Sequence, residues 1–421
     1  MILVPYGNHE IHFPIKQNVK VYYLIPKAVE KVEDVKKETY KAINNPLGHS
    51  LESFKTFRNV EEICIVVSDH TRPLPLGPIV EAILDKFEEE KVDPSKVTIL
   101  VGGGLHETNE KAMRSILGER ILRRVGGLLF HNAKNYEDLI YLGKTTRGTP
   151  IWLNRHYLEA DKRIVIGAIT PHQIVGYTGG AKGVAIGVAG YDTIENIHKL
   201  LTHPKAGLGK LDGNPAREEI DEIGRIAKID LLINATLNYK NEVAKIFAGD
   251  WRSVFEFGVN YAKRLVEVPT PETFEVVITS PGGYPRDINV YQSQKALSAA
   301  EIVTRVGGYI VLAAECCEGI GDPVFEKVME SFSSPNDIID YLSREGLRMG
   351  YHKAYLWSRT LLKYKIICVS KLNKELNRVL KCEIVNSPEE AIETISKKLT
   401  LKKIGVIPYA STIVPILKKE I

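Results

Sequence analysis

The chain lacks the sequence features that mark several large protein classes. No apolar run in its 421 residues approaches the roughly 20 residues that a membrane-spanning helix needs. The N-terminus has no basic segment followed by a long apolar one, so we expect no secretory signal peptide and a cytoplasmic protein. The net charge of +4 is divided over many charges of both signs, which is too weak to indicate a nucleic-acid partner.

Cysteine is scarce and shows no metal-binding or redox spacing. The five cysteines include no C-x-x-C pair. Cys64 and Cys368 lie within apolar runs, so we expect most of the five to be buried thiols in a reducing compartment. The chain also has no G-x-x-x-x-G-K-[ST] spacing and no G-x-G-x-x-G motif directly after a strand. These absences exclude two common nucleotide-binding motifs.

What the chain does contain is an alternation of apolar runs and helical patterns. The runs that predict strands are Ile63–Ser68, Val97–Gly102, Arg163–Ala168, Asp230–Ala235, Glu275–Ser280, Tyr309–Ala314, Lys365–Val369 and Ile404–Pro408. The helical patterns are Leu76–Glu90, Gln292–Val306, Pro323–Glu330 and Pro388–Leu399, the last beginning after the N-cap residue Ser387. Strands that are apolar on both faces, with helices between them, predict an α/β fold with mostly parallel sheets.

The polar, proline-bearing segment Val268–Glu272 predicts a boundary between two α/β domains. We therefore expect an N-terminal domain of residues 1–268 and a smaller C-terminal domain of residues 269–421. Ligands of such folds bind beyond the carboxyl ends of strands, and clefts between domains are common pockets. The sequence therefore predicts an active-site cleft between the two domains.

Polar side chains follow each of the first three predicted strands. Asp69 and Arg72 follow the first strand, a glycine-rich turn ending in His106 follows the second, and His172 follows the third. Taken alone, each is better explained as a strand-end turn or a structural histidine. Because one fold directs all three strand ends to one region, together they indicate a site. The planar guanidinium of Arg72 suits a carboxylate or a phosphate.

The densest combination of glycine and chemically active side chains lies between Pro171 and Leu200. Its centre reads Gly179-Gly180-Ala181-Lys182-Gly183. Glycines let the backbone approach a bulky ligand closely, and a lysine there can act as a charge or as a nucleophile. A lysine without this context is usually a solvated surface residue, so the flanking glycines carry the prediction of a ligand site.

A helix is expected after this loop, capped by Asp192 or Thr193 and running to Leu201. It carries His198, which could supply one metal ligand if a cofactor supplied the others. Without such a cofactor, a single helix histidine is more often structural.

The second predicted domain offers Tyr291, Gln292 and Lys295 at a helix start. Residues 291 and 295 are four apart and can point the same way, and a helix N-terminus favours anions. The alternative is an ordinary surface helix start. A weaker group farther along is expected to be structural: His352, Lys353 and Trp357.

Together these elements resemble the nickel-pincer lactate racemase family. The elements are Asp69-x-Thr71-Arg72-Pro73, the glycine-rich His106 turn, Pro171-His172, Gly179-Gly180-x-Lys182, Asn196-x-His198 and Tyr291-Gln292-x-x-Lys295. They occur in the family's order and at similar spacing over most of the chain. Thr178 stands where a serine is common, and Ile186 precedes Gly187 where a proline is common.

The resemblance implies a covalently bound cofactor, pyridinium-3,5-bisthiocarboxylic acid mononucleotide, carrying nickel. Lys182 would hold this nickel-pincer nucleotide, and His198 would bind nickel beside two sulfurs and a ring carbon of the cofactor. The further implied roles are those of acid/base groups (His106, His172), substrate-binding groups (Arg72, Lys295, Gln292) and groups around the cofactor (Asp69, Thr178, Gly179, Gly180, Tyr291).

The implied activity is racemisation of a small 2-hydroxy acid, with lactate as the first candidate. The hydrogen on Cα beside a carboxylate is a very weak acid, so removal as a hydride, leaving a planar 2-keto acid, is the easier route. Two alternatives stay open. One is a racemase or epimerase of another 2-hydroxy acid (malate, an aryl acid or a sugar acid) on the same cofactor. The other is a non-enzymatic nucleotide- or anion-binding protein whose glycine loop cradles phosphate.

The expected partners are few. They are the 2-hydroxy acid itself and, transiently, the enzymes that build the cofactor, with no nucleic acid and no membrane. An exposed helical face is compatible with a homodimer.

Overall fold

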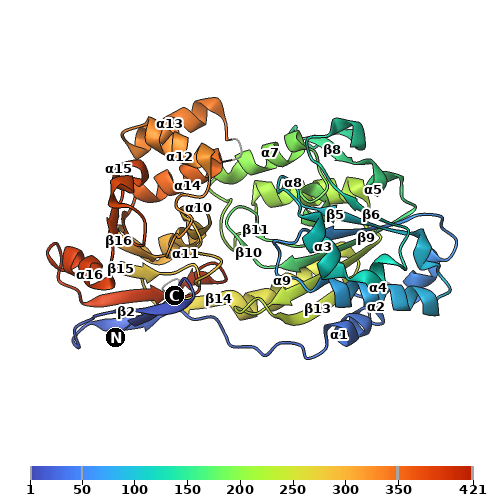
Figure 1. Cartoon of the computed structure of the whole chain (residues 1–421), viewed down its shortest axis with the longest axis horizontal. Coiled ribbons are helices and arrows are strands. Elements are labelled where there is room, and N and C mark those ends of the chain that lie inside the picture. The colour runs from blue at the N-terminus through green and yellow to red at the C-terminus, as the bar shows by residue number, and fades with distance from the viewer. Residues whose placement is uncertain (1, 49–50, 348–349, 419–421) are drawn as a thin grey trace. The chain divides into compact units, whose positions relative to one another are not determined.

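Two six-stranded sheets form the framework of the computed structural model, which describes residues 2–48, 51–347 and 350–418 (Figure 1). Each sheet belongs to its own compact unit. The central unit spans Ala28–Leu265, and the terminal unit combines the N-terminal segment up to Lys27 with the chain from Val266 onward. Both units are α/β, as the sequence predicted.

The sheet of the central unit has the strand order β13-β12-β9-β4-β5-β6. Its strands are β4 (Ile63–Ser68), β5 (Val97–Gly102), β6 (Gly127–Phe130), β9 (Lys162–Ile169), β12 (Leu231–Leu237) and β13 (Val243–Gly249). All neighbouring pairs are parallel except β12 with β13. Every residue of β12 is buried, because helices cover both faces of a sheet of this kind.

Helices and short hairpins surround this sheet. The helices are α1 (Val35–Ile43), α2 (Leu76–Glu89), α3 (Glu110–Leu117), α4 (Glu119–Leu122), α5 (Arg155–Glu159), α6 (Lys182–Ala185), α7 (Tyr191–Lys199), α8 (Pro215–Ala227) and α9 (Trp251–Val266). The hairpins pair β7 (Leu139–Lys144) with β8 (Pro150–Asn154), and β10 (Pro171–His172) with β11 (Gly176–Tyr177). Helices α2, α3 and α4 contact one another beside the sheet (Figure 1).

The sheet of the terminal unit has the strand order β18-β17-β16-β15-β19-β3, and all its neighbouring pairs are parallel. These strands are β3 (Lys20–Tyr23), β15 (Phe274–Thr279), β16 (Thr304–Ala313), β17 (Lys365–Val369), β18 (Glu383–Val385) and β19 (Lys403–Ile407). Two smaller sheets pair β1 (Ile2–Tyr6) with β2 (His9–Phe13), and β14 (Glu267–Thr270) with β20 (Val414–Leu417).

The helices of the terminal unit are α10 (Val290–Ser293), α11 (Lys295–Val303), α12 (Pro323–Ser331), α13 (Pro335–Glu345), α14 (Tyr351–Leu361), α15 (Asn377–Leu380) and α16 (Pro388–Ser396). Helix α14 contacts both α12 and α13 (Figure 1). Ser387 caps α16 through its side chain, as predicted. Among the described residues, no helix combines the length and the apolar character needed to cross a bilayer.

The division into units differs from the predicted domains 1–268 and 269–421. The N-terminal segment joins the terminal unit because β3 pairs with β19, with Lys20 opposite Lys403. The backbone N–H of Gly7 also donates to Asp287 at 2.6 Å. The first pairing joins residues 383 positions apart and the second joins residues 280 positions apart, so no local sequence pattern predicts them.

The single helix predicted over Gln292–Val306 is wrong in two respects. It is two helices, α10 and α11, that meet at Gln294, and Thr304 already begins β16. The cysteines agree with the prediction: all are free thiols, and Cys64, Cys316 and Cys368 are buried.

Candidate active site

Three adjacent parallel strands bring the predicted polar residues of the central unit to one edge of its sheet. Strand β4 lies between β9 and β5, so the carboxyl ends of all three strands meet there. Asp69 follows β4, the turn to His106 follows β5, and His172 follows β9. The position of the candidate site at strand ends was therefore predicted from the sequence.

Asp69 is a buried carboxylate at this edge of the sheet. Only 2% of its side chain is exposed, and its carboxylate accepts hydrogen bonds from Thr71 N at 2.8 Å and from the Thr71 hydroxyl. Burial alone would raise the pKa of Asp69. The hydrogen bonds from His106 and Thr71 and the charge of Arg72 outweigh burial and hold that pKa well below its usual range. Asp69 is therefore an anion at neutral pH.

His106 lies directly against this anion. Its Nδ1 is 3.1 Å from Oδ2 of Asp69, and Nη2 of Arg72 lies 3.3 Å from the same nitrogen. Because the buried carboxylate can only accept, we assign the hydrogen to Nδ1 of His106. The lone pair then lies on Nε2, and 40% of the His106 side chain is exposed. His106 is arranged to take up a proton at Nε2.

His172 has the opposite arrangement. It lies on the β10–β11 hairpin, and its Nδ1 accepts from the backbone N–H groups of Ile174 at 3.2 Å and Val175 at 3.3 Å. An imidazole that accepts at Nδ1 carries its hydrogen on Nε2. In this conformation His172 is arranged to donate at Nε2.

The glycine turn that precedes Lys182 adopts a backbone that other residues rarely accept. Gly179 has φ +88° and Gly180 has φ +60°, and a Cβ atom on Gly179 would lie 2.6 Å from Ile169. Thr178, just before the turn, donates its hydroxyl to the carbonyl of Ala168 at 2.6 Å. The Thr178 hydroxyl thus fastens the loop to the end of β9.

Lys182 begins helix α6 directly after this turn. Burial and, to a smaller extent, the nearby charges of Arg72 and Arg217 together lower the pKa of its amine to about 7, with the charge of Asp69 acting in the opposite direction. About half of the amine is therefore neutral near pH 7, whereas an ordinary lysine is almost fully charged. A neutral amine is a nucleophile, which a covalent attachment requires.

His198 lies on α7, as predicted, but the predicted cap is wrong. Gly190 is the N-cap, and Asp192 and Thr193 lie inside the first turn. Nδ1 of His198 donates to the carbonyl of Ile194 at 2.8 Å, which puts the lone pair on Nε2. Burial lowers the pKa of His198 to about 4, helped by the charges of Lys182 and His106. The imidazole is thus neutral at pH 7, as a metal ligand must be.

Three buried polar atoms near these strand ends have no hydrogen-bond partner among the described residues. They are Ser68 Oγ at the end of β4, Thr108 Oγ1 in the loop after β5, and Gln173 Oε1 in the hairpin after β9. Buried polar atoms are nearly always hydrogen-bonded, so unpartnered ones at one sheet edge are typical of a ligand site.

In the terminal unit, Gln292 and Lys295 are in contact. Nζ of Lys295 donates to Oε1 of Gln292 at 2.7 Å, across the junction of α10 and α11. Tyr291 lies on α10, and burial raises the pKa of its hydroxyl. Nζ of the buried Lys353 lies 5.1 Å from the centre of the Tyr291 ring.

The three residues predicted to be structural are all buried in α14: His352, Lys353 and Trp357. Trp357 is structural, because its Nε1 donates to the carbonyl of Leu380 at 2.8 Å. Lys353 and His352 pack against Tyr291, one of the predicted site residues.

Comparison with known proteins agrees with the sequence resemblance. Residues 6–209 match the lactate racemase N-terminal domain, and residues 270–414 match the lactate racemase C-terminal domain. The chain belongs to the lactate racemase family. As a member of this family, it is an isomerase that acts on a hydroxy acid.

Two proteins named lactate racemase have similar sequences. The lactate racemase of Thermoanaerobacterium thermosaccharolyticum is 28% identical over 381 residues, 88% of either chain. That of Lactiplantibacillus plantarum is 29% identical over 378 residues, 87% of this chain and 88% of the other.

Solved structures show the same fold. The lactate racemase apoprotein of T. thermosaccharolyticum superposes with a TM-score of 0.89 and 26% identity, covering 99% of this chain and all of the other. A Thermotoga maritima protein superposes with a TM-score of 0.67 at 17% identity over 92% of this chain. This second match shows a similar fold only.

Two buried polar residues near the Lys182 loop were not predicted from the sequence, and they also lie outside both matched ranges. Arg217 is buried on α8, and Asn234 is buried on β12. A polar residue in the centre of the apolar run Leu231–Leu237 was a signal that could have been noticed for Asn234. Arg217 had no such signal, because arginine on an amphipathic helix is ordinary.

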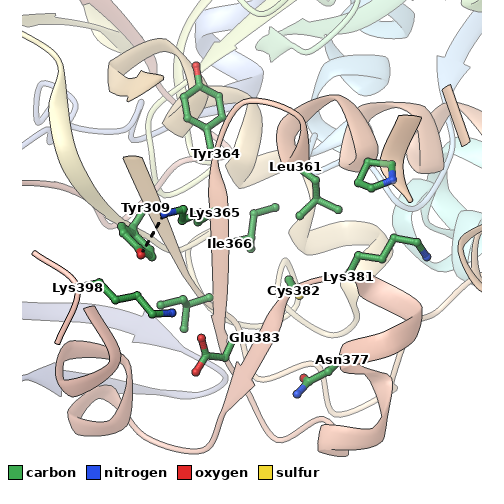
Figure 2. A pocket seen from close by; sticks show the side chains of 12 residues that line it. Tyr309, Leu361, Tyr364, Lys365, Ile366, Asn377, Lys381, Cys382, Glu383 and Lys398 are labelled. Carbon is green, nitrogen blue, oxygen red and sulfur yellow. Dashed lines mark hydrogen bonds between the residues drawn. The ribbon is translucent and has the colours of Figure 1, made fainter. Parts of the chain in front are cut away.

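A hollow of about 520 Å³ lies elsewhere, over β17 and β18 of the terminal unit (Figure 2). Tyr309, Lys365, Lys381, Cys382 and Glu383 are among the side chains that line it. None of the predicted site residues is in this lining, so the hollow is separate from the candidate site of this family member.

Proposed function

We propose that this chain racemises lactate by moving the Cα hydrogen as a hydride to and from a nickel-pincer nucleotide attached to Lys182. The observation that carries the proposal is the environment of Lys182. Lys182 follows two tightly packed glycines in the chain. Its amine is close enough to Asp69 and Arg72 to feel their charges, and its pKa is lowered to about 7. An ordinary lysine on the protein surface has none of these features.

The residues present fit the proposed cofactor. Lys182 offers a partly neutral amine for the covalent bond, and Gly179, Gly180 and Thr178 form the loop that would lie against the nucleotide. His198 offers one neutral imidazole with its lone pair on Nε2, which suits a metal whose other ligands come from the cofactor. The three unpartnered polar atoms at the strand ends supply hydrogen-bonding groups for such a ligand. When bound, the cofactor would supply a reversible acceptor for the hydride.

The proton transfers fall to the two histidines of the central unit. His106 takes the proton of the substrate hydroxyl at Nε2, and the resulting imidazolium is stabilised by the anionic Asp69 on Nδ1. His172 serves the opposite face, where its Nε2–H binds the oxygen of the planar keto acid. Full proton donation by His172 requires its imidazolium form, in which Nδ1 gives up its contacts with Ile174 and Val175.

The substrate carboxylate needs a positive partner through both half-reactions. We propose Arg72 and Lys295 for this role, with Gln292 orienting the ammonium of Lys295 through their 2.7 Å hydrogen bond. Asp69 and Tyr291 would help to shape the pocket around the cofactor.

The proposal is tested with protein produced together with the enzymes that build the cofactor, in the cytoplasm where we propose they meet. Intact and peptide mass spectrometry report an adduct on Lys182, and chiral chromatography reports conversion of enantiopure lactate. We expect both, and we expect His106→Ala and His172→Ala to abolish racemisation while the adduct persists.

The same experiment separates the alternatives. A Lys182 adduct with turnover of malate, an aryl acid or a sugar acid, but not of lactate, would correct the substrate. Absence of any adduct under these conditions would overturn the proposed cofactor chemistry and favour a binding protein.

A further inference from the structure

One peptide group in the glycine turn is held at both of its ends by buried side chains. The carbonyl of Gly179 accepts from Nη1 of Arg217 at 3.3 Å. The N–H of Gly180, which belongs to the same peptide unit, donates to Oδ1 of Asn234 at 2.9 Å. The two contacts come from different elements, helix α8 and strand β12.

Such a clamp matters because a peptide between two glycines is easily turned over. Without Cβ atoms, Gly179 and Gly180 have access to both signs of φ, so rotation of their shared peptide exchanges its carbonyl and N–H at little steric cost. The clamp distinguishes the two orientations: a guanidinium can only donate, and a side-chain carbonyl oxygen can only accept. A turned peptide would face each partner with the wrong group.

The two clamping side chains are themselves fixed. Arg217 is 3% exposed, stacks on the Phe255 ring at 4.3 Å and donates from Nε to Asp221 at 3.0 Å. Asn234 is fully buried at the centre of the apolar strand β12. Loss of either contact would leave a buried polar group unpaired, which is costly.

The clamped peptide helps to fix the backbone position of Lys182. Gly179 O accepts a second hydrogen bond, from the backbone N–H of Lys182 at 3.3 Å, and Lys182 is the first residue of α6. If the peptide turned over, this hydrogen bond would be lost. The Lys182 side chain would then extend from a backbone in a different position.

We propose that Arg217 and Asn234 are positioning residues that clamp the Gly179–Gly180 peptide and thereby present the Lys182 amine for covalent attachment. The proposal rests on the proposed function, because it assigns Lys182 the attachment. The charge of Arg217 also helps to lower the pKa of Lys182, which favours the neutral amine.

The first test uses the chain without any cofactor. Lys182 is acetylated with sulfo-N-hydroxysuccinimidyl acetate. The neutral amine nitrogen bonds to the acetyl carbon, the ester bond between that carbon and the succinimidyl oxygen breaks, and sulfo-N-hydroxysuccinimide leaves as its anion while the amine gives one proton to the buffer. Peptide mass spectrometry gives the rate at Lys182 relative to the exposed Lys111 in the same sample. This readout needs neither nickel nor substrate.

Paired variants separate the clamp from simple packing. Asn234→Leu removes the acceptor, whereas Asn234→Asp keeps an oxygen in place. Arg217→Met removes the donor, and Arg225→Met, on the exposed side of the same helix α8, is the matched control. We expect N234L and R217M to slow Lys182 acetylation by about tenfold or more, because small misplacements of a reacting group have effects of that size. N234D and R225M should stay within about twofold of the unchanged chain.

Equal rates in all four variants, or N234D as slow as N234L, would overturn the clamp. If N234L does not fold, hydrogen exchange of the unchanged chain decides instead. The clamp requires the Gly180 amide to exchange at least about a hundredfold more slowly than an unprotected amide, and fast exchange would overturn it.

The second test asks whether the clamp serves the proposed function. In preparations made with the cofactor-building enzymes, the fraction of chain carrying a Lys182 adduct should fall in N234L and R217M and recover in N234D. If the unchanged chain carries no adduct, the proposed function has failed, while the acetylation series still decides the clamp. An unchanged adduct fraction together with slowed acetylation would overturn the role in attachment.

Discussion

The carboxylate of Asp69 lies 3.1 Å from Nδ1 of His106, and it is the more deeply buried of the two groups. Their contact places the hydrogen of the imidazole on Nδ1 and leaves the lone pair of Nε2 available to accept a proton. A buried carboxylate that orients a histidine in this way is a common feature of general-base catalysis.

Asp69→Asn should therefore lower activity without changing the shape of the site. The amide can present a donor to Nδ1 and thus favour the wrong tautomer of His106. We expect kcat/KM to fall by about a hundredfold or more. Because the two enantiomers are equally stable, kcat/KM must fall by the same factor in both directions, measured with each pure enantiomer. Asp212→Asn, at an exposed turn, is the control and should be inert; a D69N enzyme with normal activity would contradict the assigned base.

The reactivity of Lys182 should depend on pH near neutrality. Only the neutral amine reacts, and its pKa is lowered to about 7 by burial and by Arg72 and Arg217. Acetylation of Lys182 should thus rise with pH, reach half its maximum near pH 7 and level off above it. The exposed Lys111 should keep rising toward its ordinary pKa, about 10.4. A Lys182 profile that coincides with that of Lys111 would show that the amine is solvated.

The same amine should reduce the stability of the ligand-free chain. The folded pKa of Lys182 lies below the unfolded one, so the unfolded chain binds more protons between the two values and stability rises with pH across that window. Replacement by methionine removes this penalty. We expect Lys182→Met to raise the free energy of unfolding by about 1–2 kcal/mol at pH 6. The gain should shrink as pH approaches 10, as measured by urea unfolding; a gain that does not change with pH would exclude the amine as its source.

His198→Ala should separate metal binding from cofactor attachment. The variant removes the one imidazole proposed to hold nickel but leaves Lys182 and its turn untouched. We expect elemental analysis to show most of the nickel lost while intact mass shows the organic adduct retained. His203→Ala, an exposed histidine shortly after the same helix, should keep both. Full nickel content in H198A would mean that another group is the protein ligand.

Gly180→Ala should lower the free energy of unfolding by more than the strain of a positive φ alone would. Its Cβ would approach the Phe255 ring to 2.9 Å at a φ of +60°. Gly148→Ala is the matched control, because Gly148 has a φ of +89° but open space around its Cβ. We expect G148A to cost about 1 kcal/mol, from backbone strain alone, and G180A about 2–4 kcal/mol. Thermal denaturation checks both; equal losses would show that the turn is not tightly packed.

Much of the framework could be read from the chain alone, because the patterns concerned are local. Ile63–Ser68, Val97–Gly102 and Lys365–Val369 are strands with the predicted ends, and Ser387 caps its helix as predicted. Apolar runs bounded by turn residues and a serine before a proline act over a few positions, so they survive in any tertiary context.

Local patterns were less successful where tertiary contacts compete with them. The α10–α11 junction at Gln294 interrupts an apparently continuous helix, and Gln294 there accepts from the buried Lys353. Likewise Gly190 caps α7, although Asp192 and Thr193 have the better capping side chains, because Thr193 donates instead to the carbonyl of Pro150 in the neighbouring hairpin.

The order of residues by itself determined that this is an α/β protein with titratable side chains placed after strands and in one glycine-rich loop. Only the tertiary structure decided which strands are neighbours, that β3 from the N-terminal segment completes the large sheet of the terminal unit, and that Arg217 and Asn234 reach the two ends of one peptide beside Lys182. The reason is physical: the propensity of a segment depends on its own few residues, whereas pairing and burial depend on groups that folding brings together from distant parts of the chain.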